Sequence, residues 1–172
     1  VTDGIVVETD SDMYVQRPYY IVPTISASEV TTDMTGGSTN VLLSGCQGFK
    51  VSENARDTLD ISTVLSPSEG AFVKTDPQKM TSYDKEDGDA DGPFSVAVTV
   101  SEDVSGTSDE DSDSSGADGA TTETDNAATE TATSDETKTT QLVAIASSAI
   151  LDSSMNSMVS DGNYTLYMNA MK

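Results

Sequence analysis

Histidine is absent from this 172-residue chain, and Cys46 is its only cysteine. Without an imidazole base or ligand, the chain cannot form His-based catalytic triads, Cys–His nucleophile pairs, HExxH zinc sites or histidine-ligated haem. A single cysteine also excludes a disulfide bond within the chain. The sequence therefore lacks the residues of the commonest nucleophilic and zinc-dependent enzyme classes.

Basic residues are scarce as well. Eight Lys and Arg residues stand against 30 Asp and Glu residues, so the formal net charge is -22. Such a surface repels phosphate backbones and anionic lipid headgroups, which makes nucleic acid and simple electrostatic membrane docking poor hypotheses. We expect partners that are neutral or cationic.

Long apolar runs are also missing. The longest, from Leu142 to Ala146, falls far short of the roughly 20 residues that a membrane helix needs. The chain opens at Val1 in a strand-like pattern, with no signal-peptide pattern, and closes at Lys172 within a helical one. We expect a fragment of a longer protein, with membrane contact only through segments that this fragment does not include.

Residues 101–140 have an unusual composition. They contain 17 Ser or Thr residues, 12 Asp or Glu residues and a single Lys, with no aromatic residue. Such a segment cannot bury enough apolar surface to offset the entropy of ordering its backbone, which costs about 1 to 2 kcal/mol per residue. We therefore predict one domain over residues 1–172, with residues 101–140 as a disordered acidic insertion rich in Ser and Thr.

The residues after this segment predict a strand and two helices. The continuous apolar run at residues 142–146 is typical of a strand buried on both faces in a parallel sheet. Ser147 and Ser148 can cap a helix, and Asn163 can cap a second one. The expected apolar stripes are Leu151, Met155, Met158 and Val159 on the first helix, and Tyr164, Tyr167, Met168 and Met171 on the second.

Further elements are predicted before the acidic segment. Phe94, Val96, Val98 and Val100 alternate with smaller residues, which indicates a strand at residues 94–101. Other strand candidates are residues 4–8, 19–22, 40–44 and 61–65, and residues 27–33 suggest a short helix capped by Ser26 with Glu29 three positions later. Strands mixed with helices and a buried final strand favour the α/β class, with a mostly parallel or mixed sheet.

The order of several short motifs resembles a known family. These motifs are VVETDSDMY, YYIVPTISASEVTTDM, VLLSGCQGFKVS, TVLSPSEGAFVKT, GPFSVAVTVSE and TQLVAIASSAILDSSMNSMVSDGNYTLYMNAMK. In sequence and order they resemble the extracytoplasmic region of gliding-motility-type ABC transporter auxiliary proteins, a family of uncharacterized ABC-type transport systems in bacteria. The resemblance covers nearly the whole chain apart from residues 101–140.

The resemblance implies a fold and a setting. The expected fold has three layers and is similar to class I glutamine amidotransferases, and this chain would be part of such a domain. The expected location is the cell-surface face of the membrane, on an anchored protein whose partners are the membrane subunits of an ABC transporter. The resemblance implies no particular ligand and no cofactor.

An amidotransferase-like fold directs attention to Ser44-Gly45-Cys46-Gln47-Gly48, which follows a predicted strand. The amidotransferase nucleophile elbow is Gly-x-Cys-x-Gly, whereas residue 44 is Ser, and no histidine is present to activate the thiol. We therefore predict that Cys46 is a small buried core residue and name no catalytic residue. A pair of carboxylates acting as general acid and base is the other enzymatic option.

An acidic turn at residues 86–94 reproduces half of an EF-hand calcium loop. Asp87, Asp89 and Asp91 would occupy loop positions 1, 3 and 5, but position 12 is then Val98 in place of a bidentate Glu. A strand also follows where the exit helix should be. We expect an acidic turn that leads into a core strand and no metal, with these three Asp residues as the calcium candidates.

Two further patterns have alternative interpretations. Asn163-Tyr164-Thr165 fits a glycosylation sequon, although a helix cap explains Asn163 better. Four tyrosines, Tyr14, Tyr19, Tyr20 and Tyr83, either line a binding cleft or are half-buried strand and loop residues. Apart from these tyrosines, the sequence indicates no ligand-binding residue.

These observations favour a non-catalytic extracytoplasmic accessory domain of an ABC-type transport system that acts by binding or scaffolding. One alternative is a cell-surface interaction or adhesion module, for which the acidic Ser/Thr segment is mild support. A carboxylate-based hydrolase is the enzymatic alternative.

Overall fold

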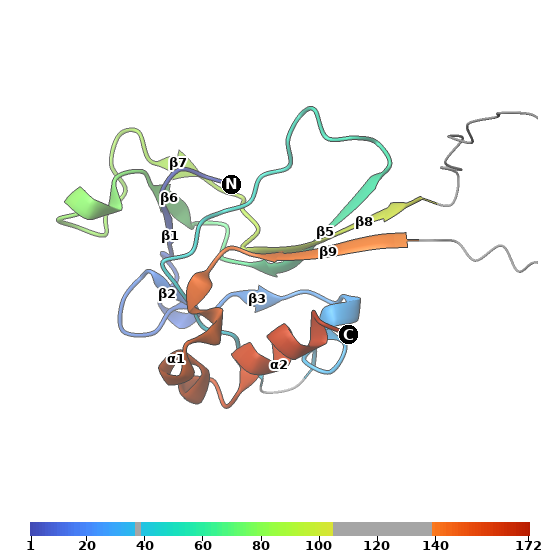
Figure 1. Cartoon of the computed structure of the whole chain (residues 1–172). Helices are drawn as coiled ribbons and strands as arrows, with labels where there is room; N and C mark the ends of the chain where they lie inside the picture. Colours follow the sequence, from blue (N-terminus) through green and yellow to red (C-terminus); the bar gives the residue numbers. More distant parts are fainter. Residues whose placement is uncertain (37–38, 105–138) are drawn as a thin grey trace, which may run out of the picture.

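A computed structural model describes residues 1–36, 39–104 and 139–172 (Figure 1). Within them the chain forms short strands, 3-10 helices and two α-helices. The strands are β1 (Ile5–Val7), β2 (Tyr20–Ile21), β3 (Thr24–Ile25), β4 (Leu43–Ser44), β5 (Leu59–Ser66), β6 (Phe72–Lys74), β7 (Ala90–Asp91), β8 (Ala97–Asp103) and β9 (Thr139–Ile145). The helices are η1 (Ser11–Met13), η2 (Glu29–Thr31), η3 (Pro77–Lys79), η4 (Ser148–Leu151), α1 (Ser153–Met158) and α2 (Gly162–Asn169).

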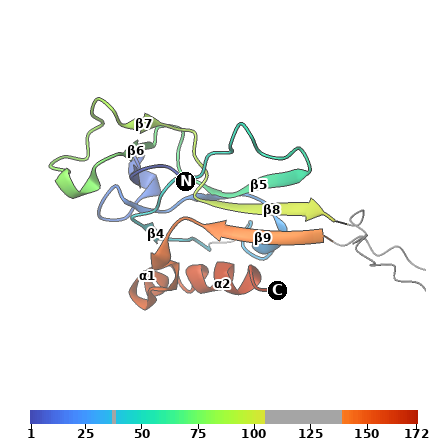
Figure 2. The same ribbon diagram turned by 45° about the horizontal axis from the view of Figure 1, so that its top comes forward.

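The strands form three small sheets with orders β1-β6-β7, β2-β4 and β3-β5-β8-β9. Every strand pair among the described residues is antiparallel. Figures 1 and 2 place α1 and α2 on one side of β8 and β9. The chain is therefore mixed α/β, as predicted, but its sheets are antiparallel.

The prediction of a parallel strand buried on both faces at residues 142–146 is wrong. β9 is the last strand of its sheet and pairs with β8 antiparallel, with Leu142 opposite Val100. Val143 and Ile145 pack against the core, whereas the side chain of Leu142, on the opposite face, is 58% exposed. An apolar run alone did not distinguish this edge strand from a central one.

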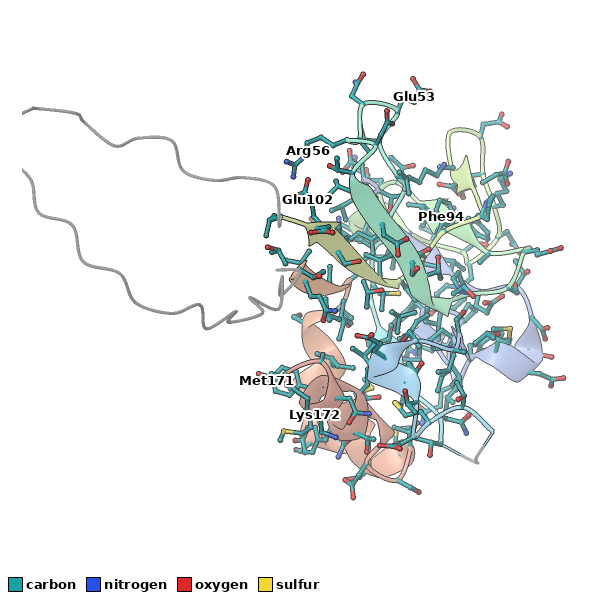
Figure 3. All side chains as sticks on the ribbon, turned by 90° about the vertical axis from the view of Figure 1, so that its right-hand side faces the viewer. Glu53, Arg56, Phe94, Glu102, Met171 and Lys172 are labelled. Carbon is teal, nitrogen blue, oxygen red and sulfur yellow. The ribbon has the colours of Figure 1, made fainter. Side chains whose placement is uncertain are left out.

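The predicted disordered segment is too long at both ends. Residues 101–103 belong to β8 and residues 139–140 belong to β9, where Ser101 lies opposite Gln141. At this end of the sheet Arg56 Nη2 lies 2.9 Å from Glu102 Oε2 (Figure 3). The prediction from composition rested on apolar burial alone, whereas the backbone hydrogen bonds of a strand pair form with polar side chains as well. Residues 105–138 lie outside the described part of the chain, so the disorder prediction stands untested there.

The other strand predictions are largely confirmed. Residues 4–8, 19–22 and 40–44 contain β1, β2 and β4, and residues 61–65 lie within β5. β8 begins at Ala97, three residues later than the alternating pattern suggested. The preceding Phe94 and Val96 are nevertheless buried in the core.

The predicted helix at residues 27–33 is only a turn of 3-10 helix. Its capping box joins Ser28 and Thr31, not Ser26 and Glu29, and the Ser28 N–H donates to Thr31 Oγ1 at 2.9 Å. Ser147 does cap the following element as predicted, because its Oγ accepts from the Ala149 N–H at 3.2 Å. That element, η4, ends at Leu151, and Asp152 caps α1 separately.

Both predicted apolar stripes are wrong as core faces. On α2, Met168 and Met171 are 58% and 67% exposed, while Leu166 is fully buried. On the preceding helices Leu151 and Met158 are also exposed, and Val159 is buried. The buried face of α2 follows Asn163 and Leu166, so a polar residue occupies a core position that the hydrophobic pattern could not reveal.

Asn163 joins α2 to the strand region around β4. Its Oδ1 accepts from the Leu42 N–H at 2.8 Å, and its Nδ2 donates to the Leu42 carbonyl at 2.9 Å. α2 begins at Gly162, so Asn163 lies inside the helix and the prediction that it caps the helix is wrong; the N-cap is Asp161, in the left-handed region at φ 67°. Close approach also requires Gly162, since a Cβ there would lie 1.9 Å from the Asn40 carbonyl oxygen.

One hydrophobic cluster connects the three sheets with α2. Its buried members are Val6, Ile21, Val30, Met34, Val41, Leu43, Cys46, Val64, Leu65, Ala71, Val73, Phe94, Val96, Ala97, Ile150 and Leu166. In the described ranges, no helix has the length and apolar character required to cross a bilayer.

The Asn163 bridge can be tested by substitution. We expect Asn163→Ala to lower the free energy of unfolding by about 2 to 5 kcal/mol, because it leaves the buried N–H and carbonyl of Leu42 without partners. Urea denaturation measures the change. Asn169→Ala is the matched control on the same helix, since the Asn169 side chain donates at 3.2 Å to the Val30 carbonyl and accepts at 2.8 Å from the exposed Lys172 Nζ. Equal losses in the two variants would contradict the role assigned to Asn163.

Candidate functional site

Three of the four tyrosines proposed from the sequence gather at one place. The rings of Tyr19 and Tyr20 have centroids 4.8 Å apart, and those of Tyr19 and Tyr83 are 5.9 Å apart. Tyr19 immediately precedes β2, whereas Tyr83 lies in the segment after η3. Tyr14 is not part of this group; it is half-buried and forms a backbone bridge with Ile21.

Arg17 completes the group. Its backbone is held in a tight turn, in which Gln16 has φ 62° and the Tyr20 N–H donates to the Arg17 carbonyl at 2.8 Å. Its Nη1 donates to the hydroxyl oxygen of Tyr19 at 3.2 Å and to that of Tyr83 at 3.5 Å. The hydrogen bond to Tyr19, followed by the effect of Tyr83, raises the pKa of Arg17 above its ordinary value. The guanidinium is therefore a permanent positive charge.

These side chains border a surface pocket of about 420 Å³, which we call the Arg17–Tyr pocket. It is lined by Ile5, Arg17, Tyr19, Pro77, Met80, Thr81, Ser82 and Tyr83. The volume falls within the range of small-molecule sites, roughly 300 to 1,000 Å³. Among the described residues, this lining includes no carboxylate, thiol or imidazole. The arrangement is suited to binding rather than to nucleophilic or acid–base chemistry.

The sequence indicated the tyrosines but not Arg17. An isolated arginine in a polar loop has no periodic signal, and its partner Tyr83 is 66 residues away. The residue types at positions 17–20 gave no reason to pair Arg17 with Tyr19 or Tyr83. Only the fold brings the guanidinium within hydrogen-bonding distance of both hydroxyls.

A second hollow, of about 250 Å³, lies over one face of β5, β8 and β9. Strand register places Asp60, Ser101 and Gln141 in one row across this face. Glu29 of η2 closes the hollow, and its Oε2 accepts from Gln141 Nε2 at 3.3 Å. Glu29 and Asp60 both line this hollow, so it offers the pair of carboxylates that the hydrolase alternative requires.

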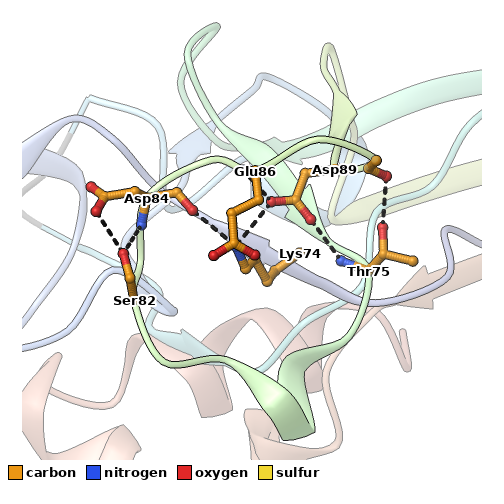
Figure 4. Close-up of polar contacts among 7 residues, drawn as sticks. Lys74, Thr75, Ser82, Asp84, Glu86 and Asp89 are labelled. Atoms are coloured by element: carbon orange, nitrogen blue, oxygen red, sulfur yellow. Dashed lines mark hydrogen bonds and ion pairs between the residues drawn. The ribbon is translucent and has the colours of Figure 1, made fainter.

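The acidic turn is organised around Lys74 of β6 (Figure 4). The Lys74 side chain is 3% exposed, and its Nζ lies 2.9 Å from Glu86 Oε2 and 3.1 Å from Asp89 Oδ2. It also donates to the Asp84 carbonyl at 2.9 Å. Burial alone would lower the pKa of Lys74, but these two carboxylates outweigh it and raise the pKa. The ammonium is thus the cation at the centre of this turn.

The three calcium candidates have separate roles. Asp89 accepts from the Glu86 N–H at 2.9 Å and the Thr75 N–H at 3.1 Å, in addition to its ion pair with Lys74. Asp91 belongs to β7 and pairs with Lys85, whereas Asp87 is exposed. Across the described ranges, no group of three His, Cys, Asp or Glu residues could hold a metal ion.

The acidic turn expected from the sequence is not uniformly exposed, because the side chain of Asp89 is nearly buried. The signal available in the sequence was Lys74 itself, a lysine that ends the apolar strand Ala71-Phe72-Val73. A lysine at such a position requires anionic partners, and a lysine-centred turn supplies them.

Cys46 lies in the core, as predicted. Its side chain is fully buried two residues after β4. Burial raises the pKa of the Cys46 thiol to about 12, so the reactive thiolate is scarcely populated near neutral pH. Asn163, the sequon residue, is also fully buried, and both ends of its amide are bonded to Leu42. Its side chain is consequently inaccessible in the folded protein.

No protein-family model, curated protein or solved structure matches this chain. The resemblance to ABC transporter auxiliary proteins is therefore carried by the order of the sequence motifs alone.

The Asp89–Lys74 ion pair predicts a pH-dependent stability. Burial alone would raise the pKa of Asp89, but the N–H groups of Glu86 and Thr75 and the Lys74 ammonium together lower it. Because the pKa is lower in the folded state than the unfolded value of about 3.9, the unfolded state binds more protons, and this contribution is lost as pH falls through the folded pKa.

We therefore expect Asp89→Asn to destabilise the protein clearly at pH 7 and less at pH 3, measured by urea unfolding at both values. Asp87→Asn, which alters an exposed carboxylate of the same turn, should have little effect at either pH. An Asp89→Asn effect that is the same at pH 7 and pH 3 would refute the assignment.

Proposed function

We propose that this chain is a non-catalytic binding domain, and that it serves as an extracytoplasmic accessory domain of an ABC-type transport system. The observation that supports binding is the Arg17–Tyr pocket, where two tyrosine rings and a guanidinium border an open cavity. Tyrosine rings offer large, rigid apolar contact area and polar tips at low entropic cost. Such a surface recognises a ligand without transforming it.

The transport setting rests on the family-like motif order. In that proposal the chain belongs to an anchored protein at the cell-surface face of the membrane, and its partners are the membrane subunits of the transporter. The three-layer fold similar to class I glutamine amidotransferases is also part of this proposal. The mixed α/β character of the described residues is compatible with it, whereas the antiparallel pairing of β8 and β9 is a departure from a mostly parallel sheet.

The exposed apolar side chains of the C-terminal helices are the part of the described surface where a protein partner can be sought. Leu151, Met158, Tyr164, Met168 and Met171 are all exposed. Tyr164 and Met168 lie one turn apart on α2, and contiguous exposed apolar patches commonly mark contact sites. A photo-reactive group at Met168 would therefore report on a neighbour.

The accessory role predicts a specific cross-link. In the native membrane, the full-length protein carrying a photo-reactive residue at Met168 should cross-link to a membrane subunit of an ABC transporter. The same group at Lys79, an exposed position on η3 far along the chain, is the control and should give less of that product. Absence of any transporter subunit among the products, together with turnover of a glycan or peptide substrate by the purified chain, would overturn the proposal.

A further inference from the structure

The geometry points to a carboxylate as the group that the Arg17–Tyr pocket recognises, and to an acidic sugar as its bearer. This inference rests on the proposed binding function and specifies the ligand class. Its basis is the unused edge of the Arg17 guanidinium, the two tyrosines that line the same pocket, and the hydroxyl groups of the lining.

The hydrogen bonds of Arg17 leave one edge of the guanidinium open. Nη1 carries two hydrogens, and the hydroxyl oxygens of Tyr19 and Tyr83 both accept from that atom. In the part of the chain that the structure describes, no hydrogen bond or ion pair is formed by Nε or Nη2 of Arg17. The edge between Nε and Nη2 presents two parallel N–H groups, which is the geometry that binds a carboxylate through both oxygens.

Four other cations of the described residues pair with carboxylates, whereas Lys50 and Lys172 donate to neutral oxygens. Arg56 pairs with Glu102, Lys74 with Glu86 and Asp89, Lys79 with Asp76, and Lys85 with Asp91. Of the two arginines, Arg56 pairs with a carboxylate and Arg17 is held only by neutral hydroxyls, in a sequence with 30 acidic residues. The two phenols fix the guanidinium in place, so a ligand carboxylate would meet a pre-organised donor pair.

The remaining lining favours a sugar as the body of the ligand. Tyr83 is 38% exposed, and its ring together with Tyr19 offers faces on which the C–H face of a pyranose can stack. Thr81 adds a hydroxyl, and Met80 and Pro77 add apolar surface. A uronic acid unites a stacking C–H face, ring hydroxyls and one carboxylate in a molecule that suits a cavity of about 420 Å³.

The overall negative charge limits the affinity but does not prevent binding. At physiological ionic strength, charges more than about 8 Å away are largely screened, so the local guanidinium dominates the field at its own edge. A single acidic monosaccharide should therefore bind weakly, with a Kd on the order of 1 mM.

Titration followed by NMR tests the inference on the whole chain. Glucuronate should shift the Arg17 Nε–H and the Tyr83 ring resonances, and glucose, which lacks the carboxylate, should bind about tenfold or more weakly. Arg17→Gln should lose the difference between the two sugars. Arg17→Lys should lose most of it, because an ammonium cannot offer the paired N–H edge. Arg56→Gln, at another exposed arginine, is the matched control and should bind glucuronate like the unmodified chain.

The outcomes separate the inference from the proposed function. Equal binding of glucuronate and glucose at the pocket would overturn the carboxylate assignment while leaving a binding domain. Tighter binding of a short peptide with a free C-terminal carboxylate than of glucuronate would overturn the sugar assignment. Absence of any shift at Arg17 and Tyr83 with all three probes would count against both. Spectra that are unchanged outside the pocket would establish that Arg17→Gln is folded.

Discussion

Two hydrogen bonds between the Asn163 amide and the backbone of Leu42 tie the C-terminal helices to the residues around β4, 121 positions earlier in the chain. A single side chain here satisfies both the backbone donor and the backbone acceptor of one buried residue, a role otherwise taken by a neighbouring strand. Gly162 makes the contact possible, because any Cβ would collide with the Asn40 carbonyl. Once α2 is docked in this way, Leu166 enters the core, and the methionines of the same helix are left facing solvent.

Buried charge follows a related rule. Lys74 is surrounded by Glu86, Asp89 and the Asp84 carbonyl, so its positive charge is fully compensated. Glu8, which is also buried, has no cation among its recorded partners within the described residues. Its carboxylate instead accepts from the backbone N–H groups of Thr9, Asp10 and Ser68 and from the Ser68 hydroxyl. In a chain of net charge -22, cations are too few to neutralise every buried carboxylate, and neutral donors take their place.

Local patterns predicted local structure well and distant pairing poorly. Alternation and β-branched residues located β1, β2, β4 and β5, and the burial of Cys46 followed from its surroundings. Strand direction was missed, because an apolar run at an antiparallel edge looks like one in a parallel sheet. The core face of α2 was missed for a different reason: hydropathy assigns a polar residue such as Asn163 to the surface, whereas two specific hydrogen bonds place it inside. The candidate site shows the same division, since the tyrosines were visible in the sequence and their arrangement around Arg17 was not.

The state of Arg17 is a consequence of these constraints taken together. Folding places Lys74, Lys79 and Lys85 beside the carboxylates of their own turns, within a few residues along the chain or across a short hairpin. Arg17 lies in a tight turn whose side-chain partners are phenols, and none of the acidic residues shortly before it, Glu8, Asp10 and Asp12, pairs with it. A guanidinium held by neutral hydroxyls keeps its full charge and its rigid geometry, and Arg17 is one of the residues that line the Arg17–Tyr pocket. Stability alone gives no reason for that arrangement, since a carboxylate at position 19 or 83 would hold the same arginine more strongly. Recognition of a carboxylate on a ligand would give such a reason.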